Sequence, residues 1–318
     1  MVSSQRLRCV GHGWQGRCLL ALLLGLCLLL ANQASASGDR HVLVLGRISD
    51  DPRKHHGQLK PLLDYVVPRM ASVGITQGRI LMARDAQQMA SYLRRGRVDW
   101  VTETSGGAVL LAERGGAEPL LLTERNGVAQ YHTVFFTRRD SPLSSLEQLR
   151  GKRLALQGAM STSAYMVPLT TLLDAGVQPE ILMGPDDTPV ADRVGYVYAR
   201  SERNIATWVH RGLVDAGAFS NLDWDDQESM PDHIRRDLRI VQRTDSYPRA
   251  VELVRSDLSQ PVRERLREVL LEASRDPAAG PALRQFFGTS AFARVDQASQ
   301  ARLDALRRGL HRVRMEVE

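Results

Sequence analysis

Apolar and polar residues alternate in blocks along the chain, and the spacing inside the blocks switches between two periods. Short aliphatic runs at 41–46, 77–83 and 153–157 give way to glycine or polar residues, which predicts buried strands. Between the first two runs, apolar residues recur every three or four positions and predict an amphipathic helix that ends near Pro68: Leu59, Leu62, Leu63, Val66 and Val67. The preceding segment, Arg47–His56, is predicted to be a polar loop.

The same two periods continue to the end of the chain. Strands that alternate with helices favour an α/β fold with mostly parallel sheets, whose faces are covered by the helices. Further helices are expected at 86–95, 108–114, 260–273, 281–287 and 296–313, and further strands at 131–138, 238–241 and 250–254.

A short repeat divides this pattern into two halves. The sequence Arg-Gly-x-Val-Asp occurs at Arg95–Asp99 and again at Arg211–Asp215, each time after a predicted helix and before a predicted strand. Glycine after a helix supplies a left-handed cap, and Val-Asp begins the strand. Two α/β lobes of similar build explain the repeat. We expect lobe 1 at 37–129 plus 249–318, with the last helices packed on it, and lobe 2 at 130–248.

The first 36 residues differ from the rest in composition. Three arginines precede the apolar run Leu19–Ala31, and the small residues Ala34 and Ala36 follow it. This layout predicts a secretory signal peptide at 1–36, because the run is shorter than the ~20 residues that a spanning helix needs. An uncleaved membrane anchor is the alternative. All three cysteines fall inside this segment, so no disulfide is predicted for the exported chain.

The charge distribution argues against two classes of partner. The whole chain has a formal net charge of +6, and the signal segment contains three arginines and no acid, which leaves +3 on residues 37–318. Basic and acidic residues are interspersed without a long run of one sign. The sequence therefore predicts neither a nucleic-acid groove nor a polybasic membrane face.

Recognisable motifs of catalysis are also missing. Ser161 lacks the Gly-x-Ser-x-Gly elbow of hydrolases, and neither a phosphate-loop nor a dinucleotide-binding glycine pattern occurs. His55 and His56 are adjacent, point in different directions and have no third ligand nearby, so no metal site is predicted. We expect a protein that is not an enzyme and needs no cofactor.

Three hydroxyl residues, Ser161, Thr162 and Ser163, line up where a predicted strand gives way to a helix. Helix starts at the carboxyl ends of strands offer free amides, and neighbouring hydroxyls complete a site for a small oxyanion. Alternatively, one of these hydroxyls only caps the helix, which contributes about 1 kcal/mol. Pro168 either delays the regular helix until after Ser163 or kinks it.

Five segments carry a resemblance to a known family. Ser161–Pro168 matches a Ser-Thr-Ser-Gly-Phe-x-x-Pro element, Tyr131–Val134 an aromatic start of the second lobe, and Asp140–Gly151 an Asp-Ser-Pro segment with a leucine helix. Ser201–Asn204 and Gly212–Asp215 match a His-Glu-x-Asn helix and its following strand. These segments follow one another along the chain in the same order as in the family that they resemble, the periplasmic substrate-binding proteins of the phosphate/phosphite/phosphonate ABC transporters. The resemblance covers most of residues 41–275.

The resemblance implies a fold and a set of ligand contacts. The fold is a two-lobed type II periplasmic-binding fold, in which each lobe is a mixed, mostly parallel sheet flanked by helices and the ligand cleft lies between the lobes. The resemblance favours ligand contact over simple capping at Ser161, Thr162 and Ser163. Tyr131 matches a ligand-contacting tyrosine of the family, and its alternative role is packing between the lobes.

The first-lobe strand exit and one helix start supply the remaining candidates. Thr104 and Ser105 are candidates for an opposing set of donors, with helix capping as the alternative. Glu103 is either a receptor for a ligand amine or a solvated carboxylate at the rim, and the rim role is favoured. The sequence departs from the family at Ala86, which replaces a tyrosine, and at Ser201, which replaces a histidine and is kept as a candidate contact.

Together these features predict the periplasmic solute-binding component of an ABC importer. The expected ligand is a small oxyanion such as phosphonate, phosphite or phosphate, and the expected partner is an inner-membrane ABC permease. The chain is expected to act as a monomer and to bind no nucleic acid. The alternative is a periplasmic sensing subunit that presents its bound state to a membrane receptor or histidine kinase, and a third class is an enzyme built on the same fold.

Overall fold

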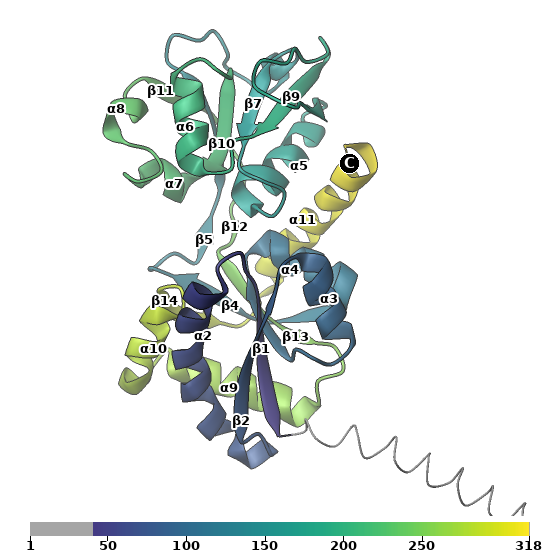
Figure 1. The fold of residues 1–318 in the computed structure, drawn as a ribbon, viewed down its shortest axis with the longest axis vertical. Helices are drawn as coiled ribbons and strands as arrows, with labels where there is room; N and C mark the ends of the chain where they lie inside the picture. The colour runs from purple at the N-terminus through teal and green to yellow at the C-terminus, as the bar shows by residue number, and fades with distance from the viewer. Residues whose placement is uncertain (1–40, 318) are drawn as a thin grey trace, which may run out of the picture.

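The computed structural model describes residues 41–317, which form two lobes. Figure 1 shows the lobes one above the other, with the short strands β5 (Gln130–Tyr131) and β12 (Tyr247–Pro248) between them. The predicted signal peptide lies outside the described residues. Within residues 41–317, no helix is both long enough and apolar enough to cross a membrane.

Lobe 1 is built on a six-stranded sheet with the order β14-β4-β13-β3-β1-β2. The strand β1 pairs in parallel with β2 and β3, while β13, β4 and β14 extend the sheet with antiparallel pairs. Both faces of the sheet are buried by helices, as an aliphatic parallel strand requires. The strands are Val42–Ile48 (β1), Gln77–Ala83 (β2), Trp100–Glu103 (β3), Ala117–Arg125 (β4), Ala250–Arg255 (β13) and Thr289–Ala293 (β14). The helices are Pro52–Val66 (α2), Val67–Val73 (η1), Ala86–Arg94 (α3), Ser105–Gly115 (α4), Gln260–Ala273 (α9), Pro277–Ala279 (η4) and Gly280–Gln285 (α10).

Lobe 2 repeats this construction with the sheet order β11-β6-β10-β7-β9-β8. The neighbouring strands β10, β7, β9 and β8 are parallel, β6 pairs antiparallel with β10, and the edge strand β11 pairs antiparallel with β6. The predicted fold class, two α/β lobes with mixed sheets flanked by helices, is confirmed. The strands are Thr133–Arg138 (β6), Arg153–Leu156 (β7), Gln178–Ile181 (β8), Arg193–Tyr198 (β9), Ala216–Ser220 (β10) and Leu238–Arg243 (β11). The helices are Glu147–Leu149 (η2), Thr162–Met166 (η3), Val167–Asp174 (α5), Glu202–His210 (α6), Asn221–Asp225 (α7) and Asp232–Arg235 (α8).

The two copies of Arg-Gly-x-Val-Asp have the same structural role in the two lobes. Gly96 (φ 62°) and Gly212 (φ 69°) provide the left-handed residue after α3 and α6. Asp99 Oδ2 accepts a hydrogen bond from the backbone N–H of Val44 on β1, and Asp215 Oδ2 accepts one from that of Arg153 on β7, each at 2.8 Å. The repeated aspartate therefore ties the strand after it to the neighbouring strand of its own lobe.

The last helix, α11 (Gln297–Glu316), packs on both lobes and not on lobe 1 alone as predicted. Its apolar stripe joins a core cluster that includes residues of α4 in lobe 1 and α5 in lobe 2. Gly309 permits a close approach to α5, because a Cβ there would lie 2.1 Å from Thr170 Cγ2. Figure 1 shows α11 running beside the lobe boundary toward α5. Near its C-terminal end, ion pairs join α11 to both helices: Arg314 with Glu113 on α4 (2.6 Å) and Arg312 with Asp174 on α5 (2.7 Å).

Several segments differ from the predicted elements, among them the strands β4, β8 and β9, which were not predicted, and two further cases have a clear physical reason. The second half of the predicted loop Arg47–His56 is helical, because Asp51 caps α2 by accepting the N–H of Lys54 (3.1 Å) and proline is comfortable at Pro52 in the first turn. Strand β14 lies between two predicted helices and was missed. It is a short edge strand made of small and polar residues around one buried Phe292, so it carries little apolar signal.

Candidate functional site

Two helix starts meet at the boundary between the lobes. The helix α4 follows β3 with Thr104 as its N-cap, and the π-helical turn η3 follows β7 with Ser161 as its N-cap. The Thr162 hydroxyl donates a hydrogen bond to Thr104 Oγ1 (2.9 Å) and accepts one from the backbone N–H of Gly106 (3.0 Å). The structure therefore brings together two predicted site residues, one from each lobe, at the start of a helix.

The hydroxyl turn is shaped by an irregular helix start. Ser161 Oγ accepts the N–H of Ala164 (3.1 Å), so this side chain makes the cap that the sequence offered as an alternative role. Ala164 (φ −113°, ψ 18°) departs from helical geometry, and the regular helix α5 begins only at Val167, with Pro168 in its first turn. The expected delay of the helix near Pro168 is therefore present. Thr162 and Ser163 are buried.

Glycine at the start of α4 allows the two lobes to approach this closely. A Cβ on Gly106 would lie 2.7 Å from Thr162 Oγ1 and 2.3 Å from Met166 Sδ, so any larger residue pushes η3 away. The first amides of a helix have no partner inside the helix and carry a partial positive charge. The Thr162 oxygen thus occupies the kind of position in which helix starts bind the oxygens of anions.

Ser105 and Ser163 are tied to the strands that connect the lobes. The Ser105 hydroxyl is fully buried and donates to the carbonyl of Pro248 on β12 (2.5 Å). The carbonyl of Ser163 accepts a hydrogen bond from the Thr133 hydroxyl (2.9 Å), which also lies 3.0 Å from the hydroxyl of Tyr247. Ser105 therefore contacts a strand between the lobes directly, whereas the Ser163 carbonyl is bound within lobe 2 and is linked to Tyr247 only through Thr133.

Tyr131 lies at the crossing between the lobes with its ring packed. It meets the ring of Tyr247 edge to face (4.5 Å between centroids), and the Arg249 guanidinium carbon lies 5.0 Å from its ring centre. Burial raises the pKa of the Tyr131 hydroxyl to about 12, against the opposing effects of Arg249 and of hydrogen bonding with Thr162. The hydroxyl therefore keeps its proton at neutral pH.

Ser201 sits at another helix start in lobe 2. Its hydroxyl caps α6 by accepting the N–H of Asn204 (3.2 Å), and no hydrogen bond in the described part of the chain joins it to the Thr162 contact. Two carboxyl groups lie near it. Burial raises the pKa of Glu202, with Asp223 adding to the effect, and burial raises the pKa of Asp223 against hydrogen bonds from Ser220.

Glu103 is not a solvated carboxylate at the rim, and the favoured prediction for it was wrong. The side chain is only 6% exposed, and its Oε1 lies 3.1 Å from Nη1 of Arg47. That nitrogen directs its hydrogen bond to the carbonyl of Thr102 (2.8 Å), so Glu103 Oε1 has a charged neighbour but no hydrogen bond among the described residues. Its other oxygen accepts the N–H of Thr104 (3.3 Å), at the start of α4.

Sequence reasoning missed the buried charges behind Glu103. Glu252 is fully buried on β13 and accepts hydrogen bonds from Trp100 (2.6 Å), Thr102 (2.7 Å) and Thr123 (2.7 Å). Arg125 donates to the hydroxyl of Thr102 (3.0 Å). Burial lowers the pKa of Arg125 to about 10, partly offset by Glu252, so the guanidinium remains charged at neutral pH. A lone acid inside the apolar run 250–254 was the available sequence signal.

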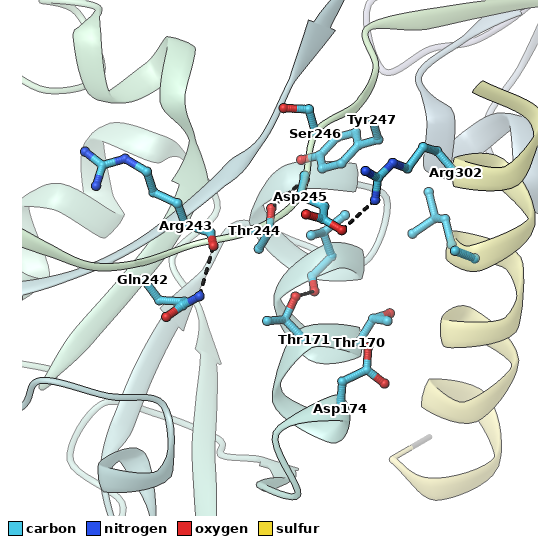
Figure 2. A pocket seen from close by; sticks show the side chains of 13 residues that line it. Thr170, Thr171, Asp174, Gln242, Arg243, Thr244, Asp245, Ser246, Tyr247 and Arg302 are labelled. Carbon is cyan, nitrogen blue, oxygen red and sulfur yellow. Dashed lines mark hydrogen bonds and ion pairs between the residues drawn. The ribbon is translucent and has the colours of Figure 1, made fainter. Parts of the chain in front are cut away.

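A separate cavity of about 360 Å³ is lined in part by the segment that returns from lobe 2 to lobe 1 (Figure 2). It lies between α5, that returning segment and α11, and Arg302 of α11 pairs across its mouth with Asp245. Most of its lining is polar, and the hydroxyls of Thr170 and Thr171 donate to carbonyls one helical turn back (3.0 and 2.8 Å). The predicted ligand contacts lie elsewhere. In residues 41–317, no group of three or more His, Cys, Asp or Glu side chains is placed to hold a metal ion.

Solved structures share this architecture. The XAC2383 protein from Xanthomonas citri bound to chloride ion is 57% identical, with a TM-score of 0.82 over 86% of this chain and 99% of that chain. The same protein bound to ATP is 56% identical, with a TM-score of 0.83 over 87% of this chain and 100% of that chain. PhnD1 from Prochlorococcus marinus in complex with methylphosphonate has the same fold at 16% identity, with a TM-score of 0.60 over 86% and 99% of the two chains.

The family match covers most of the chain and agrees with the fold. Residues 48–300 match the family described as ABC transporter, phosphonate, periplasmic substrate-binding protein. This confirms the resemblance that the Ser-Thr-Ser element and the neighbouring segments carry in the sequence. The chain therefore belongs to the phosphonate family of periplasmic substrate-binding proteins of ABC transporters.

Proposed function

We propose that this chain is exported and serves as the solute-binding component of an ABC importer, which takes a small oxyanion such as phosphonate, phosphite or phosphate between its lobes. One observation carries the proposal: the amide of Gly106, at the start of α4, is already engaged by a hydroxyl oxygen from the opposite lobe, that of Thr162. An oxyanion offers several such oxygens at once, together with the negative charge that a helix start favours.

The binding mode follows from this contact. The ligand replaces the direct Thr162–Thr104 hydrogen bond, so that both hydroxyls and the Gly106 amide donate to its oxygens. Chloride and ATP, the ligands named for the two Xanthomonas citri structures, are both anions, which supports an anionic ligand for this chain.

Calorimetry on the purified chain tests the proposal. Phosphate, phosphite, methylphosphonate and aminoethylphosphonate form the panel, and a chain that binds none of them overturns the oxyanion assignment. For the ligand that binds, Thr162→Ala is expected to weaken binding by about 1–3 kcal/mol, because a charged acceptor loses a donor. Thr207→Ala is the matched control, since that hydroxyl donates to a carbonyl within α6 and its removal leaves the affinity unchanged.

Export and the partner are tested in cells. We expect the tagged full-length chain in the periplasmic fraction, shortened at its N-terminus, and co-purifying with an inner-membrane permease when the ligand is present. A chain that remains in the cytoplasm contradicts the proposed import role.

A further inference from the structure

Two arginines of lobe 1 pack against one aromatic ring. The guanidinium carbons of Arg47 and Arg125 lie 5.0 Å and 4.7 Å from the ring centre of Phe287. Arg47 is next to last on β1, and Arg125 is last on β4, so both lie at the ends of strands nearest the connection to lobe 2. Phe287 has a left-handed backbone (φ 55°), an uncommon conformation for an aromatic residue, in the turn before β14.

The hydrogen-bonding capacity of this pair is only partly used. Nε of Arg47 and Nε of Arg125 are buried and have no hydrogen-bond partner among the described residues. Arg125 is 6% exposed, and the fully buried Glu252, whose charge acts on it, accepts its hydrogen bonds from three other side chains. Two cations held side by side with unused donors are costly to bury, and an added anion would offset that cost.

The pair adjoins the helix start where the lobes meet. Arg47 contacts one oxygen of Glu103, and the other oxygen accepts the amide of Thr104, whose hydroxyl contacts Thr162. The Glu103 carboxylate therefore lies between the start of α4 and Arg47, and a second anionic group of a ligand bound there has to displace Glu103 Oε1, which holds no hydrogen bond among the described residues, to reach the guanidinium. A guanidinium is planar and offers paired donors that match two phosphate oxygens, which hydroxyls and a single amide do not.

We propose that Arg47 and Arg125 form a second anion subsite in lobe 1, and that the ligand carries two linked anionic groups of the diphosphate type. This inference rests on the proposed function, because the first group is the oxyanion bound by the start of α4 and Thr162. Arg47 is the more exposed of the two arginines and contacts the second group directly, while Arg125 adds charge from a nearly buried position.

Calorimetry with inorganic phosphate and inorganic diphosphate, at one ionic strength and without divalent metal, tests the subsite. We expect diphosphate to bind the unaltered chain about tenfold more tightly than phosphate, and Arg47→Met to weaken diphosphate about tenfold more than it weakens phosphate. Arg263→Met is the matched control: Arg263 is also mostly buried, also has an unpartnered Nε and pairs with Glu118, but it lies on α9. It is expected to change neither affinity.

The outcomes separate the two proposals. If phosphate or a phosphonate binds but diphosphate gains nothing, or if Arg47→Met weakens both ligands equally, the second subsite is wrong and the proposed function stands. If no oxyanion binds the unaltered chain, the proposed function fails and the subsite with it. Should Arg47→Met fail to fold, Arg47→Lys carries the test, because it keeps the charge and the stem but loses the paired donors, and diphosphate should still lose more affinity than phosphate.

Discussion

The segments that follow β3 in lobe 1 and β7 in lobe 2 meet at the lobe boundary. They occupy equivalent places in the two lobes but differ in chemistry. Lobe 2 presents neutral hydroxyls at Ser161–Ser163 and the irregular helix start η3. Lobe 1 presents Glu103 at the start of α4, backed by buried arginines and Glu252. Buried hydroxyls need only hydrogen bonds, whereas buried charges also need opposite charges close by. In the proposed binding mode, lobe 1 is therefore the half whose contribution is mainly electrostatic.

The repeated aspartates show the same contrast in a purely structural role. Asp99 and Asp215 accept equivalent backbone hydrogen bonds, but the Asp99 side chain is 9% exposed and that of Asp215 is 30% exposed. Each also pairs with an arginine, Arg255 at 2.8 Å and Arg153 at 3.4 Å. One motif thus supports a tightly buried ion pair in lobe 1 and a partly hydrated one in lobe 2.

Replacing each of the two aspartates is expected to give the largest difference between the lobes. Asp99→Ala is expected to lower the free energy of unfolding by about 2–4 kcal/mol, because it leaves a buried backbone N–H and a mostly buried arginine without this partner. Asp215→Ala is expected to cost about 1–2 kcal/mol, since water reaches the exposed groups. Urea unfolding of both variants measures the difference, and equal losses would show that burial does not distinguish the lobes.

A wedge at the boundary is expected to have a smaller effect on stability and a clear effect on binding. Gly106→Ala places a methyl group against Thr162 and Met166 and should separate the starts of α4 and η3. It is expected to lower the free energy of unfolding by about 1–3 kcal/mol. Affinity for the oxyanion that binds should fall, and small-angle scattering should show a larger radius of gyration. Gly57→Ala on α2 is the control, because its Cβ meets nothing within 4 Å and alanine favours a helix. A wedged variant that binds normally would place the ligand elsewhere.

The sequence predicted the hydroxyl side of this boundary better than the charged side, for a physical reason. Capping residues and glycine stops act within a few residues of themselves, so the helix starts at Thr104 and Ser161 are visible in the local pattern. Glu252 is visible as an acid in an apolar run, but its partners Trp100 and Thr123 lie more than a hundred residues earlier in the chain. Only the folded sheet shows that they are neighbours.

The last helix illustrates the same limit on a larger scale. The three- and four-residue spacing of Leu303, Leu306, Leu310 and Val313 predicts an amphipathic helix, and α11 is present. An apolar stripe on a helix predicts that another part of the molecule covers that face, but it does not identify the covering element. The structure shows that α4 and α5, from different lobes, share that face.

The pH dependence of stability is the smallest expected effect. It compares a histidine of lobe 1 with a histidine next to β5, where the chain crosses between the lobes. Burial lowers the pKa of His55 in lobe 1, with Arg47 adding to the effect, and burial lowers the pKa of His132 at the crossing, with Arg243 adding. The unfolded imidazoles, with the usual pKa of 6.5, therefore take up protons before the folded ones do. Their contribution to stability is fully present above pH 6.5 and is lost as the pH falls through the folded pKa.

Single replacements separate the two histidines. His55→Gln and His132→Gln should each reduce the loss of unfolding free energy between pH 7 and pH 5, as measured by urea unfolding. The fully buried Glu252 and the partly buried Glu202 and Asp223, whose pKa values are raised, contribute the opposite slope, because the folded state takes up their protons first. Comparing each variant with the parent chain cancels that common background. A variant whose unfolding free energy changes with pH as that of the parent does would show that its histidine has the same pKa in the folded and the unfolded chain. The electrostatic contrast then does not extend to that position.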